Sequence, residues 1–222
     1  MILPRPSLTL ITDRVLYRPR SDKKGDFLSL VEAAIAGGVH IVQLRVRNAA
    51  PDDLGLYAVA MRLRELTQGQ ALFVVTGDVE LAEKCRADGI LLPERSYKPS
   101  DARAFLRGEA IQAVGAFVHT VPGAGRAERG GADYVQVGPI FEPDKPPEGS
   151  DGLSLMRKIK DAVQVPVIAF GGVQTPEQIA DCLRAGADGV AVTDAITQAP
   201  DPHAATVRLR VALDAAWRAL HG

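Results

Sequence analysis

A glycine pair, Gly171 and Gly172, lies between a short apolar run that starts at Pro166 and an amphipathic segment. Apolar residues such as Ile179 and Leu183 repeat at helical spacing in that segment, so the pattern predicts a strand, a glycine turn and a helix. Glycines at such a turn let backbone N–H groups approach a ligand, and the helix N-terminus adds a partial positive charge. The stretch is typical of a phosphate site, although a glycine pair that only forms a tight turn gives the same pattern.

One of the four histidines, His119, ends an apolar run, VGAFVHT, and is a candidate acid or base. Histidine changes its charge near neutral pH and can both take and return a proton. His40 begins an apolar run, which indicates a structural role, and His203 and His221 flank the last helical pattern, which indicates solvent exposure. His119 is therefore the predicted catalytic residue.

The stretch VQLRVR carries polar side chains at alternate positions, Gln43, Arg45 and Arg47. In a strand these three share one face, and buried polar groups are costly unless they meet a ligand or one another. An anionic substrate would satisfy both arginines, and a pair of arginines bound to structural carboxylates is the alternative. A long loop rich in Pro and Gly, GPIFEPDKPPEGSDG, adds Lys145 as a further residue that can reach an anion.

The composition limits the kind of partner. The chain has 222 residues, 46% of them hydrophobic, and a net charge of −1, so it can bury one large core and has no overall charge that favours nucleic acid or an anionic membrane. Since no apolar run approaches the length of a membrane span, we expect a cytoplasmic protein with a small-molecule ligand. Cys85 and Cys182 belong to no C-x-x-C pair and are expected to be packed thiols. A homo-oligomer stays open.

A phrase recurs before four apolar runs: AGGVHIVQL, RADGILL, GGADYVQV and AGADGVAV. Four other apolar runs start at Leu8, Ala71, Ile111 and Pro166, and helical patterns separate all eight. This alternation, with near-repetition every two units, predicts a (β/α)8 TIM barrel formed by residues 1–222 as a single domain. An open doubly wound sheet is the alternative, but no break in the pattern indicates a reversal of strand order. In a barrel, residues at the carboxyl ends of the strands face the site.

The motifs resemble those of the thiamine phosphate synthase and TenI superfamily over nearly the whole chain. The similar stretches are ITDR, VQLRVR, ADGILLP, VGAFVHT, GADYVQVGPIF, VIAFGGVQTPE and GADGVAVTDAI. This resemblance implies one of two activities. A synthase joins a pyrimidine diphosphate to a thiazole phosphate with Mg²⁺, and a thiazole tautomerase aromatises a carboxythiazole phosphate without metal.

The synthase motifs are broken at the positions that the resemblance assigns to magnesium. Gly77 and Ser96 stand where the synthase pattern has two aspartates, and neither supplies the charged oxygen that Mg²⁺ prefers. Asp78 and Glu94 are near enough in sequence to substitute. The synthase Thr-x-Thr-Lys run is also absent, because the chain reads Pro143, Asp144, Lys145 and Pro146 there.

The tautomerase branch is the nearer resemblance by these motifs. It implies a metal-independent isomerase in which His119 moves a proton and no cofactor is bound, with Mg²⁺ required only under the synthase alternative. The substrate would be a thiazole phosphate. The resemblance implies further binding residues beside Gln43, Arg45 and Arg47. They are Thr76 and Lys145 for the substrate and Gly171, Gly172, Val192, Thr193 and Asp194 for its phosphate.

Asp194 departs from the superfamily pattern, which has a serine at this position. A carboxylate about 5 Å from a phosphate would cost on the order of 3 kcal/mol at an effective dielectric constant near 20. Either the Asp194 side chain turns away from the phosphate or the ligand differs. A non-catalytic barrel that binds a phosphate ligand is therefore a third hypothesis, beside the isomerase and the Mg²⁺-dependent transferase.

Overall fold

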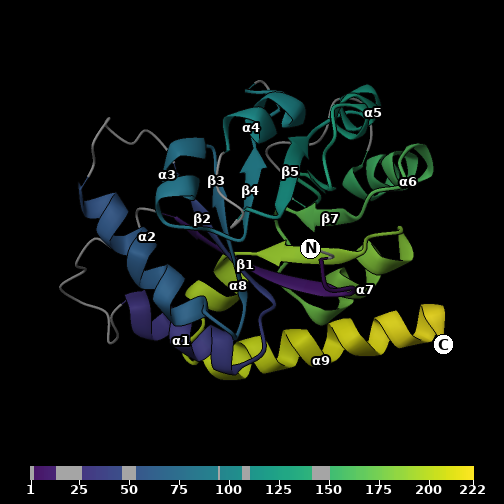
Figure 1. Cartoon of the computed structure of the whole chain (residues 1–222). Helices are drawn as coiled ribbons and strands as arrows, with labels where there is room; N and C mark the ends of the chain where they lie inside the picture. Colours follow the sequence, from purple (N-terminus) through teal and green to yellow (C-terminus); the bar gives the residue numbers. More distant parts are fainter. Residues whose placement is uncertain (1–2, 14–26, 47–53, 95, 107–110, 142–150) are drawn as a thin grey trace.

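The computed structural model describes residues 3–13, 27–46, 54–94, 96–106, 111–141 and 151–222. In these ranges strands and helices alternate, and the parallel strands close into one barrel in sequence order with helices around the outside (Figure 1). The predicted (β/α)8 barrel is thereby confirmed. The carboxyl ends of all strands meet at one rim, where the loops that follow can build a site.

The barrel consists of short strands that are buried on both faces, as expected for parallel strands covered by helices. Neighbouring strands pair in parallel around the closed barrel, including β1 with β8. Within the described ranges the strands are β1 Ser7–Asp13, β2 Ile41–Arg45, β3 Leu72–Thr76, β4 Gly89–Leu92, β5 Ala113–Val118, β6 Tyr134–Val137, β7 Val167–Phe170 and β8 Gly189–Val192.

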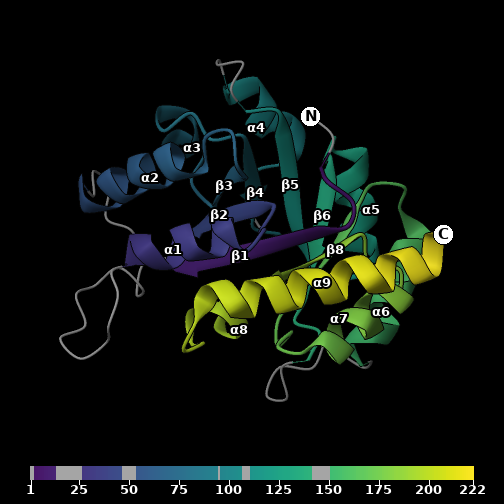
Figure 2. The ribbon, with the colours of Figure 1, turned by 90° about the horizontal axis from the view of Figure 1, so that it is seen from below.

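Several helices begin at a side chain that accepts a hydrogen bond from the first turn, which satisfies an N–H group without an intrahelical partner. Asp78, Thr120, Asp151, Thr175 and Asp201 act in this way. The helices in the described ranges are α1 Phe27–Ala36, α2 Leu54–Thr67, α3 Val79–Lys84, α4 Pro99–Phe105, α5 Val121–Arg129, α6 Gly152–Ala162, α7 Pro176–Arg184, α8 Asp194–Thr197 and α9 Pro202–His221. The short α8 was not expected from the sequence. The long α9 lies beside α1 and α7 (Figures 1 and 2).

The barrel interior is filled in layers. Because the strands are tilted, residues at the same height on alternate strands lie two positions further along the chain than the residues that the strand pairing connects. One layer comes from the even strands: Gln43, Leu91, Gln136 and Ala191. The next layer toward the carboxyl ends comes from the odd strands: Ile11, Thr76, Phe117 and Phe170. These two layers form the floor beneath the rim at which the candidate site lies.

A polar side chain stands directly before each even strand and accepts a hydrogen bond from the backbone of the preceding strand. The acceptors are His40, Asp88, Asp133 and Asp188, and their donors are the N–H groups of Leu8, Phe73, Val114 and Val167, at 2.9, 2.8, 2.6 and 2.9 Å. The three carboxylates also pair with a cation on a neighbouring helix: Arg64, Arg103 and Lys160 respectively. These contacts fix the amino ends of the strands, which is the stabilising end of such a barrel.

Candidate functional site

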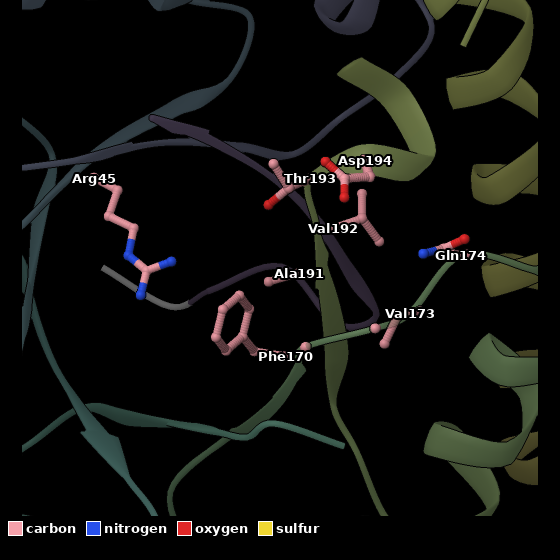
Figure 3. Close-up of a pocket in the computed structure, with 10 residues that line it drawn as sticks. Arg45, Phe170, Val173, Gln174, Ala191, Val192, Thr193 and Asp194 are labelled. Carbon is pink, nitrogen blue, oxygen red and sulfur yellow. The ribbon is translucent and has the colours of Figure 1, made fainter. Parts of the chain in front are cut away.

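A cavity of about 200 Å³ opens at the carboxyl ends of β2, β7 and β8 (Figure 3). It is too small for a whole drug-sized ligand, which usually needs at least about 300 Å³, and it suits one group of a ligand. Six of the predicted site residues line it: Arg45, Gly171, Gly172, Val192, Thr193 and Asp194. Because the Val192 side chain packs in the core between strands and helices, its backbone faces the cavity.

The glycine turn after β7 has a conformation that other residues adopt only with strain. Gly171 and Gly172 have φ angles of +96° and +72°. A Cβ atom on Gly171 would lie 2.6 Å from the Pro139 Cα, and one on Gly172 would lie 2.7 Å from the carbonyl carbon of Phe141. Both glycines are therefore required by packing against the segment after β6, which is the tight-turn interpretation of the pair.

The same turn also leaves backbone donors available at the cavity. In the part of the chain that the structure describes, the N–H groups of Gly171, Gly172 and Val173 donate to no protein acceptor, whereas the carbonyl of Gly171 accepts from Phe141 at 3.0 Å. Successive unpaired N–H groups on residues with positive φ form a concave site for an anion. The glycine pair can therefore serve both interpretations: it packs tightly against the segment after β6, and it leaves N–H groups for an anion.

Aromatic rings link Arg45 to His119 across the rim. The Arg45 guanidinium carbon lies 5.6 Å from the centre of the Phe170 ring (Figure 3), which is within the range of a cation–π contact. The Phe170 ring meets Phe117 edge-on at 5.5 Å between centroids, and Phe117 meets the His119 ring in the same way at 4.6 Å. The two phenylalanines were not predicted as site residues. Phe117 could have been indicated by its place two residues before His119 on the same strand face, and Phe170 by its place directly before the glycine pair.

His119 is exposed at the end of β5, and one contact fixes its tautomer. Its Nδ1 lies 2.7 Å from the carbonyl oxygen of Gly138, at the end of β6. A carbonyl oxygen can only accept a hydrogen bond, so Nδ1 carries the proton and Nε2 is the nitrogen that can exchange a proton with a ligand. The predicted acid or base thus has a defined orientation, but it is not among the residues that line the cavity.

The structure joins Gln43 and Thr76, two predicted substrate-binding residues, to each other. Gln43 Nε2 donates to Thr76 Oγ1 at 2.9 Å inside the barrel, below the cavity. Gln136 lies in the same layer as Gln43 but was not predicted as a site residue. It is 2% exposed, and in the described ranges its amide has no hydrogen-bond partner.

Asp194 lies at the edge of the cavity next to Thr193, as Figure 3 shows. The side chain is exposed, so water screens part of its charge from a group bound at the glycine turn. The position reduces the repulsion expected from the sequence and does not remove it. Two other predicted residues, Arg47 and Lys145, lie outside the described residues.

The described residues do not fit a magnesium site at the positions that the synthase pattern implies. Asp78 Oδ1 caps α3 by accepting from the Leu81 N–H at 2.9 Å. The Glu94 carboxylate lies against the first turn of α5, where a Cβ on Gly123 would be 2.3 Å from Glu94 Oε1. Ser96 Oγ donates to the carbonyl of Pro93 at 2.7 Å. Among the described residues no cluster of three His, Cys, Asp or Glu side chains could hold a metal ion.

A family profile described as thiamine monophosphate synthase matches residues 8–196. The chain belongs to this family. It is 42% identical over 190 residues to the thiamine-phosphate synthase of Natronomonas pharaonis, covering 83% of this chain and 86% of that one. It is 34% identical to the thiamine-phosphate synthase of Chloroflexus aurantiacus, covering 91% and 90%. The solved thiamine phosphate pyrophosphorylase of Pyrococcus furiosus superposes with a TM-score of 0.80 at 32% identity, covering 95% and 96%.

These comparisons confirm the superfamily and contradict the predicted isomerase. Relatives that are 33–42% identical over most of the chain carry the name thiamine-phosphate synthase, which is a transferase. The prediction of a thiazole tautomerase was wrong because it gave most weight to three short broken motifs, at Gly77, Ser96 and Lys145. Among the helices that the structure describes, none is both long enough and apolar enough to span a membrane.

Proposed function

We propose that this protein is a thiamine-phosphate synthase, which transfers a pyrimidine from its diphosphate to a thiazole phosphate. The main support for the proposal is the extended similarity to relatives with that name, one of which is 42% identical across 83% of this chain. A cavity at the catalytic rim with an arginine and unpaired backbone donors supports it.

The reaction sets clear demands on the site. The thiazole nitrogen forms a bond to the methylene carbon of the pyrimidine, while the bond from that carbon to oxygen breaks and diphosphate leaves with the electron pair. Negative charge therefore grows on the leaving oxygen, and two phosphate-bearing substrates must be held at once. Fixed donors and cations that point at this charge would lower the barrier.

The glycine turn supplies the proposed phosphate site. The N–H groups of Gly171, Gly172 and Val173 are available as donors, and Thr193 adds a hydroxyl on the other side of the cavity. A cavity of this size can hold a phosphate group. We therefore assign the thiazole phosphate to this position.

Arg45 is the proposed anchor for the departing diphosphate. Guanidinium groups bind phosphate oxygens through two parallel hydrogen bonds, and this geometry fits a diphosphate better than a point charge does. The contact with Phe170 holds the guanidinium at the side of the cavity that is opposite to Thr193. Arg47 and Lys145 remain proposals for the same anion.

His119 is the proposed donor to the leaving group. Since Nδ1 is held by Gly138, a protonated imidazole presents its second N–H at Nε2. That N–H can donate to an oxygen of the departing diphosphate as charge develops there. In its neutral form the same nitrogen can only accept a hydrogen bond, so the proposed role needs the doubly protonated ring.

The test is the formation of thiamine phosphate from the two substrates, followed by chromatography, with added Mg²⁺ and with EDTA in parallel. We expect turnover by the wild type, and a kcat that is on the order of a hundred-fold lower for His119→Asn. His203→Asn, which removes an exposed histidine at the start of α9, is the matched control and is expected to keep the wild-type rate. The comparison of the Mg²⁺ and EDTA reactions measures whether product formation requires a metal ion, which the diphosphate substrate could bring with it.

The outcomes separate the hypotheses. No product under either metal condition, with both substrates shown to bind, would overturn the synthase and leave a binding protein. Product formation with His119→Asn at the wild-type rate would keep the synthase and remove His119 from it.

A further inference from the structure

The cavity at the glycine turn contains one carboxylate among groups that suit an anion. In the described lining, the charged side chains are Arg45 on β2 and Asp194 at the start of α8. The strand before α8, β8, pairs with β7, which leads into the glycine turn, so Asp194 borders the cavity from the neighbouring wall (Figure 3). Because the cavity measures only about 200 Å³, a phosphate on the unpaired N–H groups meets both charges at short range.

The Asp194 carboxylate differs from the aspartates that precede other helices. Asp78, Asp151 and Asp201 each accept a hydrogen bond from a backbone N–H group of the first helical turn. Asp194 is the first residue of its helix, and within the described ranges its carboxylate accepts no hydrogen bond from the protein. An ionised carboxylate has acceptors and no donor. The side chain can therefore bind only a ligand group that brings its own hydrogen.

A phosphate monoester brings such a hydrogen in one of its two common forms. Its second pKa is about 6, so the dianion and the monoanion are both present near neutral pH. The dianion has acceptors only and is repelled by Asp194. The monoanion has one O–H group that can donate to the carboxylate, while its other oxygens accept from the glycine turn and from Arg45. One proton thus turns the repulsion into a charge-assisted hydrogen bond.

We propose that Asp194 makes this cavity bind a phosphate monoester together with a proton, and that it thereby selects phosphate over sulfate. A sulfate monoester has nearly the same shape but carries no proton near neutral pH, so it presents only acceptors to the carboxylate. Arg45 and the backbone N–H groups bind either anion and do not distinguish them. The inference rests on the proposed function, because that function supplies thiazole phosphate as the ligand.

The first test is the pH dependence of thiazole phosphate binding, measured by calorimetry at pH 8.0 and pH 5.5. The monoanion makes up about 1% of the free ligand at the higher pH and about three quarters at the lower pH. We expect the wild-type affinity to rise by roughly ten-fold or more as the pH falls. Asp194→Asn should change by less than about three-fold, because an amide can rotate to donate or to accept. The variant should bind more tightly at pH 8.0 and the wild type at pH 5.5.

The second test counts the proton directly, by calorimetry at pH 7.0 in buffers with different enthalpies of ionisation. Wild type should take up at least about half a proton for each ligand bound, and Asp194→Asn close to none. His119 lies at the same rim outside the cavity lining, so its contribution is common to both proteins. Asp161→Asn removes an exposed charge on α6 and should keep the wild-type uptake.

The third test compares thiazole phosphate with the sulfate ester of the same alcohol at pH 5.5. Wild type should prefer the phosphate by roughly ten-fold or more, and Asp194→Asn by less than about three-fold. Since the Asp194 side chain is exposed, the variant should keep the wild-type urea midpoint, and a changed midpoint together with equal loss of both ligands would assign the residue to folding and overturn the inference. Asp194→Ser, which also removes the carboxylate, should behave like the Asn variant.

The outcomes separate the inference from the proposed function. If wild type forms product but Asp194→Asn keeps the wild-type proton uptake and preference for phosphate, the inference is wrong and the synthase stands. If proton uptake depends on Asp194 but wild type forms no product, the phosphate selection stands and the synthase does not. If wild type binds thiazole phosphate at neither pH, both are wrong.

Discussion

The two ends of this barrel use polar residues in opposite ways. At the amino ends of the strands, His40, Asp88, Asp133 and Asp188 each accept a backbone hydrogen bond from the preceding strand. At the carboxyl ends, the amide of Gln136 and the N–H groups after β7 have no acceptor or donor among the described residues. In one copy of the recurring phrase, GGADYVQV, Asp133 and Gln136 are only three residues apart.

Polar residues at the amino ends of the strands and polar groups at the carboxyl ends should therefore have different roles, the first in stability and the second in ligand binding. Polar groups that satisfy one another stabilise the fold and have little capacity left for a ligand. Polar groups that are buried without partners cost stability, and a ligand can recover that cost on binding. Substitutions at the amino ends should therefore change unfolding but not chemistry, and substitutions at the carboxyl ends should do the reverse.

The largest effect on stability is expected for Asp188→Ala at the amino end. The Asp188 side chain is 7% exposed, and its Oδ2 binds Lys160 Nζ at 2.7 Å and the Val167 N–H at 2.9 Å. Its loss leaves a partly buried cation and a backbone donor without acceptors, which should lower the free energy of unfolding by about 3 kcal/mol. Urea denaturation measures this change, and kcat per folded molecule should stay at the wild-type value.

Asp133→Ala is the matched comparison at the equivalent position of the repeat. Its side chain is 37% exposed and it pairs with Arg103, which is 38% exposed. Water can replace much of what this carboxylate supplies, so the loss should be about 1 kcal/mol. An equal loss for both variants would show that burial does not determine the strength of these contacts.

His40 gives the amino end a pH dependence. Its pKa is lowered to about 4, first by burial and then by the nearby positive charge of Arg210, while Asp214 acts in the opposite direction. The folded state thus binds fewer protons at this site than the unfolded state between pH 6.5 and 4. The contribution to stability is fully present above pH 6.5 and is lost as the pH falls toward 4, by on the order of 2 kcal/mol.

The variant His40→Asp should remove most of this loss. It places a carboxylate where the other three repeats have one, within reach of the Leu8 N–H and near Arg210. Urea denaturation at pH 7.5 and 5.0 compares the two proteins, and the drop between these pH values should be smaller for the variant. A drop of the same size in both would assign the acid sensitivity to other groups.

The sequence predicted the barrel because each level of its pattern agreed. The recurring phrase marked the even strands, four other apolar runs marked the odd strands, and helical patterns separated all eight. It also placed Arg45, Gly171 and Thr193 correctly at one rim, because parallel strands have their carboxyl ends in common. The short α8 was missed, since four residues are too few to show a helical period.

The sequence could not show which polar residues are left without a partner. Gln43 and Gln136 occupy equivalent positions, but only the three-dimensional arrangement gives Gln43 a bond to Thr76 and leaves Gln136 without one. The choice between isomerase and transferase failed for a related reason. Gly77 and Ser96 indicated a lost metal site, whereas similarity along the rest of the chain indicates the synthase.

At the carboxyl end, Asp194→Asn is expected to change ligand binding and not stability. The exposed carboxylate borders the cavity that we assign to a phosphate, and water screens most of their repulsion. Removal of the charge should tighten binding of the thiazole phosphate by roughly five-fold, or about 1 kcal/mol, in calorimetry at low salt, with no change in the urea midpoint. Asp161→Asn, which removes an exposed charge on α6, is the control for net charge. Equal tightening by both variants would mean that long-range charge, and not the position of Asp194 at this rim, opposes the phosphate.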